Sequence, residues 1–203
     1  PDMLQLGGEK REMTPFFSDI QGFSTISEGL TPEELVQLLN EYLTAMCDII
    51  SSHHGTIDKF EGDAIIAFWG APLKLPNHAT VACYATLEMQ QRSVELRKML
   101  REQNRPLLYT RMGLNSGPVV VGNMGSAERM DYTMMGDVVN LAARLEGANK
   151  FYKTFSMISG STYELTKEDV DSRQLDIIRV VGKKEPVPVH ELLARKNETS
   201  SEM

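Results

Sequence analysis

Two aspartates stand where an apolar, strand-like run meets a turn. Asp19 closes a run that begins at residue 13, and Asp63 follows Gly62 in the turn of a tight hairpin predicted over residues 56–69. Adjacent strands lie about 5 Å apart, so carboxylates on neighbouring strands can bridge two metal ions separated by ~3.5–4 Å, as in two-metal phosphoryl and nucleotidyl transfer. Taken singly, each aspartate is more typical of a solvated turn.

A third segment carries polar residues at helical spacing. The pattern of residues 131–146 predicts a strand end that runs into a helix starting at Gly136 or Asp137. Asn140 and Arg144 are four residues apart, so they share one face of that helix beside an apolar stripe, and both can reach a phosphate or a sugar. By itself this pattern is also that of an ordinary amphipathic helix with surface polar residues.

Alternating strand and helix patterns predict the scaffold that positions these residues. Strands are expected at about 13–20, 107–115, 118–123, 155–159, 174–181 and 187–194, besides the hairpin at 56–69. Helices are expected at about 22–30, 31–53, 77–103 and 137–149, with a short one after Ser161. Thr31, Pro32 and Glu34 form a strong helix start with a capping box. Strands with helices crossing between them indicate an α+β sandwich.

Pro15 conflicts with the first predicted strand. In a central strand a proline removes a ladder hydrogen bond, because it has no N–H. Pro15 therefore predicts an edge position, a local bulge or an altered sequence at the start of this strand, without affecting Asp19.

Composition agrees with one domain of 203 residues, 41% of them apolar, which is enough for a substantial core. The sequence has no apolar run of membrane-spanning length and no signal-peptide pattern. A net charge of −7 argues against a nucleic-acid surface.

Cys47 and Cys83 fall in apolar helical patterns, so we expect buried, reduced thiols and a cytoplasmic setting. The histidines are expected on the surface or in loops: His53, His54, His78 and His190.

Four motifs occur in a characteristic order: FSDIQGFS, DKFEGDAIIAFWG, RMGLNSGPVVVGNMG and DYTMMGDVVNLAARLE. Together they resemble the class III nucleotidyl cyclase catalytic domain over nearly the whole chain, from about residue 10 to residue 193. The resemblance implies an α+β fold with a ferredoxin-like βαββαβ core and additional strands and helices. It divides the chain into a linker at residues 1–9, a catalytic domain at residues 10–194 and a polar tail at residues 195–203. Regulatory domains are expected upstream in the full-length protein.

The resemblance implies that Asp19 and Asp63 hold two Mg²⁺ or Mn²⁺ ions, with the Ile20 carbonyl as a further ligand. Such hard cations prefer oxygen donors. Lys59 and Thr133 occupy the two positions that read the purine in this family. Adenylate-making members typically carry Lys with Asp or Thr there, and guanylate-making members carry Glu and Cys. Lys59 can donate to adenine N1 but would face donors on a guanine edge, so the expected substrate is ATP.

Four further residues match family positions around the ribose and the phosphates. Asn140 matches the residue that orients the ribose, and Arg144 matches the one that stabilises charge on the α-phosphate, for which its planar fork of donors is suited. Arg111 and Lys183 match basic residues that contact phosphate, although Lys184 is one step from Lys183. The implied reaction is metal-assisted attack of the ribose 3′-oxygen on the α-phosphorus, which releases pyrophosphate and gives cyclic AMP.

The resemblance also implies a dimer. Lys59 and Asp63 lie in one hairpin, yet the family gives them roles at opposite ends of the nucleotide, in different sites. One protomer would supply Asp19, Asp63 and Arg111, and its partner would supply Lys59, Thr133, Asn140, Arg144 and Lys183. Because the chain carries both sets, a two-fold homodimer would form two complete sites.

Other functions stay open at this point. A diguanylate cyclase has a related fold, but it requires Gly-Gly-Asp-Glu-Phe where residues 61–65 read Glu-Gly-Asp-Ala-Ile, and it lacks the helix with Asn140 and Arg144. A non-catalytic nucleotide-binding or dimerisation module usually lacks a metal aspartate or the arginine, and both are present here. A guanylate cyclase is the less favoured alternative. The Lys59 and Thr133 pair also resembles the branch of adenylate cyclases that respond to bicarbonate, so bicarbonate stimulation is a hypothesis.

Overall fold

The computed structural model describes residues 6–126, 128–179 and 186–196. Its strands are β1 (Gly7–Ile20), β2 (Thr56–Glu61), β3 (Ala64–Trp69), β4 (Thr110–Leu114), β5 (Gly117–Gly125), β6 (Met130–Met135), β7 (Ser156–Ser159), β8 (Val170–Ile178) and β9 (Val187–Arg195). Its helices are α1 (Phe23–Glu28), α2 (Pro32–Ser52), α3 (His78–Glu102), α4 (Asp137–Tyr152) and α5 (Gly160–Thr166). Within the described ranges, none of the helices combines the length and the apolar character needed to cross a membrane.

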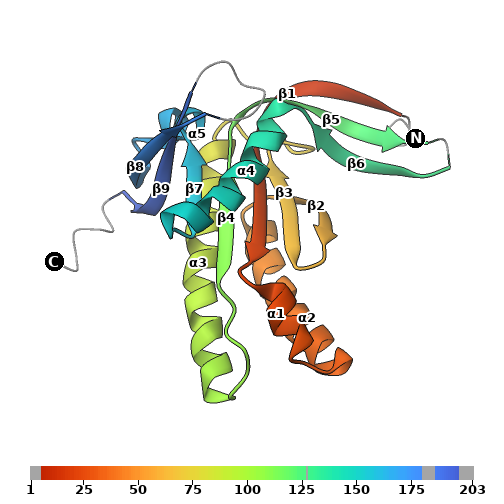
Figure 1. Cartoon of the computed structure of the whole chain (residues 1–203). Coiled ribbons are helices and arrows are strands. Elements are labelled where there is room, and N and C mark those ends of the chain that lie inside the picture. The colour runs from red at the N-terminus through yellow and green to blue at the C-terminus, as the bar shows by residue number, and fades with distance from the viewer. Residues whose placement is uncertain (1–5, 127, 180–185, 197–203) are drawn as a thin grey trace.

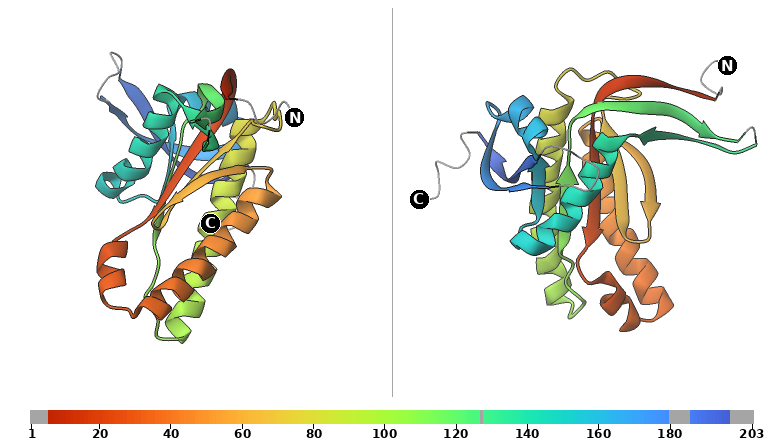
Figure 2. Two further views of the ribbon diagram at one scale, coloured as in Figure 1. Left: turned by 90° about the vertical axis from the view of Figure 1, so that its right-hand side faces the viewer. Right: turned by 45° about the horizontal axis from the view of Figure 1, so that its top comes forward.

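The sheet has the expected α+β topology. Strands β2, β3, β1 and β4 lie side by side in that order, and each pairs with the next in antiparallel fashion. With α2 and α3 as crossing helices, this is the βαββαβ order of a ferredoxin-like core. Beyond β4 the sheet continues through β7, which is parallel to β4, to β9 and β8. Helices α2 and α3 cover one face and α4 covers the other (Figures 1 and 2).

Alternation along β1 divides its side chains between these two faces. Phe16 and Ile20 are buried in the main core, which fills the space between the sheet and α2 and α3. Phe17 packs on the opposite face, in a second cluster with Ile66 of β3 and Val139 of α4. Because side chains alternate along a strand, Asp19 lies on the same face as Phe17, which is the face that carries α4.

The first half of β1 forms an arm with β5 and β6. β1 begins at Gly7, earlier than predicted, so residues 7–9 of the expected linker lie in this strand. Its first half pairs with β5, which pairs with β6, and the three strands extend away from the body (Figure 1). A β-carbon at Gly122 would lie 2.1 Å from the carbonyl oxygen of Gly7, so glycine is needed for this close approach.

Pro15 is accommodated where β1 changes partner. It lies in a central strand, so the expected edge position is wrong. The Asn115 N–H donates to the Pro15 carbonyl at 3.3 Å, and in an antiparallel pair the nitrogen and oxygen of one residue face the same neighbour. The missing N–H therefore faces residues 115–116, between β4 and β5. Since β1 passes from β5 to β4 there, Pro15 interrupts no continuous ladder.

The surface location expected for the histidines is wrong for His78 and His190, which are both buried. His78 Nδ1 lies 2.7 Å from Thr14 Oγ1, which lies 2.8 Å from Ser116 Oγ. Burial lowers the pKa of His78, although the charge of Glu12 opposes this shift.

The expectation of buried thiols holds for Cys83, and burial raises the pKa of its thiol to about 12. Cys47 is only half-buried, and both cysteines are free thiols.

Replacing His78 by Asn should make the free energy of unfolding less sensitive to acid. Because burial lowers the pKa of His78 below its ordinary value of 6.5, the unfolded chain binds the proton more readily than the folded chain. The stability that neutral His78 contributes is therefore present above about pH 6.5 and is lost as the pH falls through the folded-state pKa. Urea unfolding at about pH 7.5 and about pH 5.5 should show a smaller decrease in the free energy of unfolding for His78→Asn than for the wild type.

His54→Asn is the matched control, because His54 is exposed at a φ of 59°, which asparagine tolerates. It should leave the acid-induced decrease unchanged. An equal decrease in the wild type and His78→Asn would contradict the role given to His78.

Candidate active site

The turn between β2 and β3 brings Asp63 to the end of β1. Gly62 adopts a φ of 64°, which lets the chain reverse directly before Asp63. The Ile20 N–H donates to Asp63 Oδ2 at 2.8 Å, so Asp63 reaches the residue that follows Asp19. The two carboxylates lie close enough to interact directly. The predicted juxtaposition of Asp19 and Asp63 is therefore present in the fold.

This pair is electrostatically strained in the absence of a cation. Burial raises the pKa of Asp63 to about 6; the Ile20 N–H opposes the shift, and the negative charge of Asp19 adds to it. Two carboxylates placed together cannot both ionise at their ordinary pKa, whereas a bound cation removes this conflict. The pair thus has the electrostatic character of a cation site.

The donor set fits Mg²⁺ or Mn²⁺. In the described part of the chain, no group of three or more His, Cys, Asp or Glu side chains is arranged to hold a metal ion. Mg²⁺ is commonly held by one or two carboxylates together with substrate phosphates and water, so a two-carboxylate site suits it. Asp19, Asp63 and the Ile20 carbonyl are the oxygen donors that would hold the ions.

Arg111 lies between this pair and α4. It faces Asp19 in the register of β1 and β4, and its Nη2 donates to Asp19 Oδ2 at 2.7 Å. Its Nε lies 3.0 Å from Glu146 Oε1, an ion-pair distance at which the two atoms are not aligned for a hydrogen bond. Arg111, the predicted phosphate-contacting residue, thus lies beside the two aspartates although the three come from different segments of the chain.

Glu146 is a site residue that the sequence analysis missed. Burial raises its pKa to about 7; Arg111 opposes this shift, and the charges of Asp19 and Asp63 add to it. One sequence signal points to it, because Glu146 is four residues after Ala142, on the apolar side of the predicted helix. An acidic residue on a packed helix face requires a basic partner, and Arg111 is that partner.

Helix α4 is held on β4 at three points. A β-carbon at Gly113 would lie 2.2 Å from the Glu146 nitrogen, so the helix backbone rests directly on the strand. The Asn149 Nδ2 donates to the Met112 carbonyl at 2.9 Å near the end of the helix. The Asn115 Nδ2 donates to the Val138 carbonyl, also at 2.9 Å, near its start. These contacts fix the distance of α4 from β4 and the rotation of the helix about its own axis.

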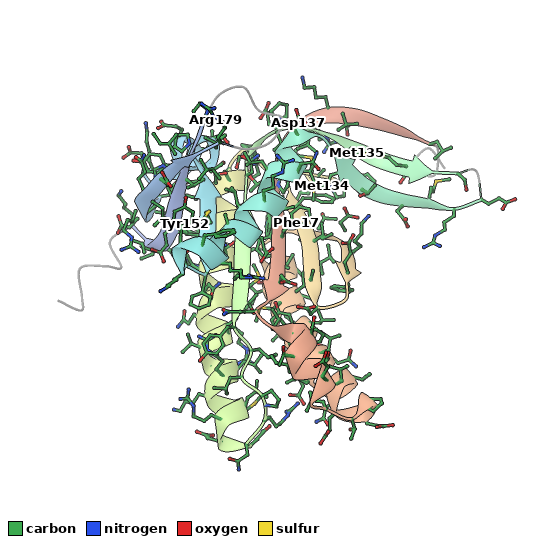
Figure 3. The ribbon with its side chains drawn as sticks, in the orientation of Figure 1. Phe17, Met134, Met135, Asp137, Tyr152 and Arg179 are labelled. Atoms are coloured by element: carbon green, nitrogen blue, oxygen red, sulfur yellow. The ribbon has the colours of Figure 1, made fainter. Side chains whose placement is uncertain are left out.

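Asn140 and Arg144 are exposed on α4, one turn apart, as the spacing predicts. The helix begins at Asp137 after Gly136, in agreement with the predicted start. Figure 3 shows Asp137 at the upper end of α4, next to Met134 and Met135 of β6, and Tyr152 at its lower end. The strand-to-helix connection thus presents Asn140 in the first turn of α4 and Arg144 one turn further along the helix.

The two predicted purine-reading residues are joined through a third. Thr133 on β6 donates its hydroxyl hydrogen to Asp58 Oδ2 at 2.7 Å. Lys59 Nζ lies 3.5 Å from Asp58 Oδ1. Asp58 was not singled out by the sequence analysis, although it directly precedes Lys59. Lys183 lies outside the described residues.

Comparison with known proteins agrees with this geometry. The family of the adenylate and guanylate cyclase catalytic domain matches residues 8–192. "Adenylate cyclase 1" of Rhizobium meliloti (strain 1021) is 39% identical over 184 residues, which make up 91% of this chain and 28% of that protein. The chain therefore spans less than a third of that relative's length.

Solved structures of both substrate types resemble the fold. The adenylyl cyclase CyaB from P. aeruginosa has a TM-score of 0.86 and 38% identity, over 95% of this chain and 98% of that chain. The guanylyl cyclase Cya2 has a TM-score of 0.87 and 36% identity, over 96% of this chain and 98% of that chain. Since the two values are nearly equal, the choice of purine depends on individual residues.

Asp63→Asn should stabilise the metal-free protein. Because the pKa of Asp63 is raised to about 6, its contribution to stability is present below about pH 4 and is lost as the pH rises through about 6. The amide keeps an oxygen for the Ile20 N–H but carries no charge. In EDTA at about pH 7.5 the free energy of unfolding should rise by about 1 kcal/mol, a value reduced for the partial exposure of Asp63.

Added Mn²⁺ should raise the thermal midpoint of the wild type and have little effect on Asp63→Asn. Asp48→Asn, an exposed change on α2, serves as the control and should behave like the wild type in both conditions. A variant less stable than the wild type in EDTA at about pH 7.5 would contradict the strain assigned to the pair.

Proposed function

We propose that this chain, which belongs to the family of the adenylate and guanylate cyclase catalytic domain, converts ATP to 3′,5′-cyclic AMP and pyrophosphate. The observation that carries the proposal is the meeting of Asp19 and Asp63 at the end of β1, with Arg111 against them. The choice of ATP is supported by Lys59, whose ammonium group can donate to adenine N1.

Two Mg²⁺ or Mn²⁺ ions, held by Asp19, Asp63 and the Ile20 carbonyl, would supply a lowered pKa at the ribose 3′-hydroxyl and neutralisation of the triphosphate. The chain's own residues position the reactants. Asn140 orients the ribose, and the Arg144 guanidinium, which is always charged, stabilises the negative charge that develops on the α-phosphate.

The reaction itself needs no protein nucleophile. The 3′-oxygen loses its proton and forms a bond to the α-phosphorus, while the bond from that phosphorus to the bridging oxygen breaks and pyrophosphate leaves. Arg111 and Lys183 contact the phosphates. Catalysis therefore depends on placing charges and reacting atoms before the reaction begins.

We propose that two copies of the chain form the site. The arm and its neighbourhood expose large apolar side chains, as expected of a surface covered by a partner: Leu6, Phe60, Val120 and Met135. One copy would give Asp19, Asp63 and Arg111, and the other would give Lys59, Thr133, Asn140, Arg144 and Lys183. In the full-length protein, upstream regulatory domains would act by changing how the two copies meet.

Mixing two inactive variants should restore activity if the site is shared. Asp63→Ala and Lys59→Ala remove residues of different half-sites, so each variant alone should lose at least about a hundredfold in cyclic AMP formation from ATP. In an equal mixture half of the dimers are mixed and carry one intact site, so about a quarter of the wild-type activity should return. The measurement is product formation with Mg²⁺ or Mn²⁺ over a protein dilution series.

Controls separate this proposal from its alternatives. A mixture of Asp63→Ala with Asp19→Ala should stay inactive. Both variants lack a residue of the same half-site, so a mixed dimer contains no intact site. Absence of product from the wild type with either metal, despite ATP binding, would favour the non-catalytic module, and cyclic GMP from GTP would favour a guanylate cyclase. No recovery on mixing Asp63→Ala with Lys59→Ala, in a wild type that makes cyclic AMP, would contradict the shared site.

We further propose that bicarbonate stimulates the enzyme, on the basis of the Lys59 and Thr133 pair alone. Cyclic AMP formation should rise across a bicarbonate titration at fixed pH and fixed ionic strength. A chloride titration is the control, because it changes ionic strength without supplying bicarbonate. A rate that does not change with bicarbonate would remove this regulation and leave the proposed activity intact.

A further inference from the structure

Asp58 connects the two residues proposed to read the purine. Its side chain is only 3% exposed, whereas that of Lys59 is 44% exposed. Oδ2 accepts the Thr133 hydroxyl at 2.7 Å, and Oδ1, which lies 3.5 Å from Lys59 Nζ, receives no hydrogen bond from the described residues. A buried carboxylate thus contacts both residues, one from β2 and one from β6.

A β-bulge gives Asp58 this position. In the ladder between β2 and β3, Ile57 pairs with Ala67 and Lys59 pairs with Ile66, so Asp58 is the extra residue. Successive side chains in a regular strand point to opposite faces, which would keep Asp58 and Lys59 apart. A bulge redirects a side chain, and here it allows the carboxylate to reach Thr133 while staying near the ammonium group of Lys59.

The Asp58 contact decides what Thr133 can offer a ligand. A threonine hydroxyl has one hydrogen to donate and two lone pairs to accept with, so by itself it can pair with either kind of group. Because the Thr133 hydroxyl donates to Asp58 Oδ2, its one hydrogen points at Asp58. Toward a ligand, Thr133 then presents only an acceptor, and Lys59 presents only a donor.

We infer that Asp58 is a positioning residue that sets the preference for adenine over guanine-type bases. Adenine offers an acceptor at N1, which complements the Lys59 ammonium group. Its 6-amino group is a donor, which complements the Thr133 hydroxyl oxygen once the hydroxyl hydrogen is donated to Asp58. A base with N1–H and a 6-oxo group offers the reverse pattern and would meet two mismatches. The inference rests on the proposed use of ATP and assigns its selectivity to a residue that contacts no substrate.

The test compares binding of two nucleotides that differ at this edge. The 3′-deoxy forms of ATP and ITP cannot cyclise, and hypoxanthine has the N1–H and 6-oxo groups of guanine without its 2-amino group. The wild type should bind the adenine form more tightly. In Asp58→Asn the amide can donate to Thr133 and free the hydroxyl hydrogen, so the ratio of dissociation constants should fall by about tenfold to a hundredfold.

Two further variants keep the inference falsifiable. Thr133→Val, which removes the hydroxyl, should lower the same ratio, and adding Asp58→Asn to it should lower the ratio little further, since both changes act through one contact. Asp48→Asn, exposed on α2, should leave the ratio unchanged. If Asp58→Asn does not fold by circular dichroism, a Thr133→Val variant that keeps the full preference would still overturn the inference, because Asp58 acts through the Thr133 hydroxyl.

The outcomes separate this inference from the proposed function. A wild type without preference for the adenine form would contradict the proposed use of ATP. A wild type that prefers adenine, together with Asp58→Asn or Thr133→Val variants that keep the full preference, would overturn the role of Asp58 alone. A general loss of affinity for both nucleotides at an unchanged ratio would also overturn it, because that is the result of a merely structural role.

Discussion

The direct backbone contact between α4 and β4 at Gly113 is the constraint on which the site depends. No side chain fits at residue 113, because a β-carbon would overlap the helix backbone at Ala142 and Glu146. The resulting closeness places Glu146 against Arg111, which the register of β1 and β4 places opposite Asp19. Asn115 and Asn149 hold the two ends of the same helix, so its outer face, with Asn140 and Arg144, is fixed by the same contact.

The inner face of this contact concentrates negative charge around one guanidinium group. Asp19 and Glu146 pair with Arg111, and Asp63 lies beside Asp19. Burial raises the pKa of Glu146 to about 7 and that of Asp63 to about 6, so the folded chain holds carboxylates where their ionisation is unfavourable. If Asp19 and Asp63 hold cations as we propose, cation binding would relieve this conflict and stabilise the fold, so a residue kept for function would lower stability when no cation is bound.

The sequence was sufficient to predict most of the elements and the closeness of Asp19 to Asp63, for identifiable reasons. Local signals fixed the helix at Thr31, whose capping box is present in the structure, and the hairpin around Gly62. Motif order then indicated the fold and the aspartate pair. Residues whose roles arise from long-range contacts were missed: Glu146 is defined by a partner on β4, and His78 is buried by contacts with β1 that its local sequence does not reveal. Lys183 lies outside the described residues and stays a prediction.

Departures from regular strand geometry explain the remaining differences between the sequence predictions and the structure. Pro15 is tolerated because β1 changes its partner from β5 to β4 at that residue, and the bulge at Asp58 turns a carboxylate toward Thr133. Strand periodicity assumes an unbroken ladder, so it assigns wrong surroundings to residues at such breaks. Both breaks lie in strands that carry candidate site residues, Asp19 on β1 and Lys59 on β2. A regular sheet would present alternate side chains to alternate faces, and it is the irregular positions that bring Asp58, Lys59 and Thr133 to one place.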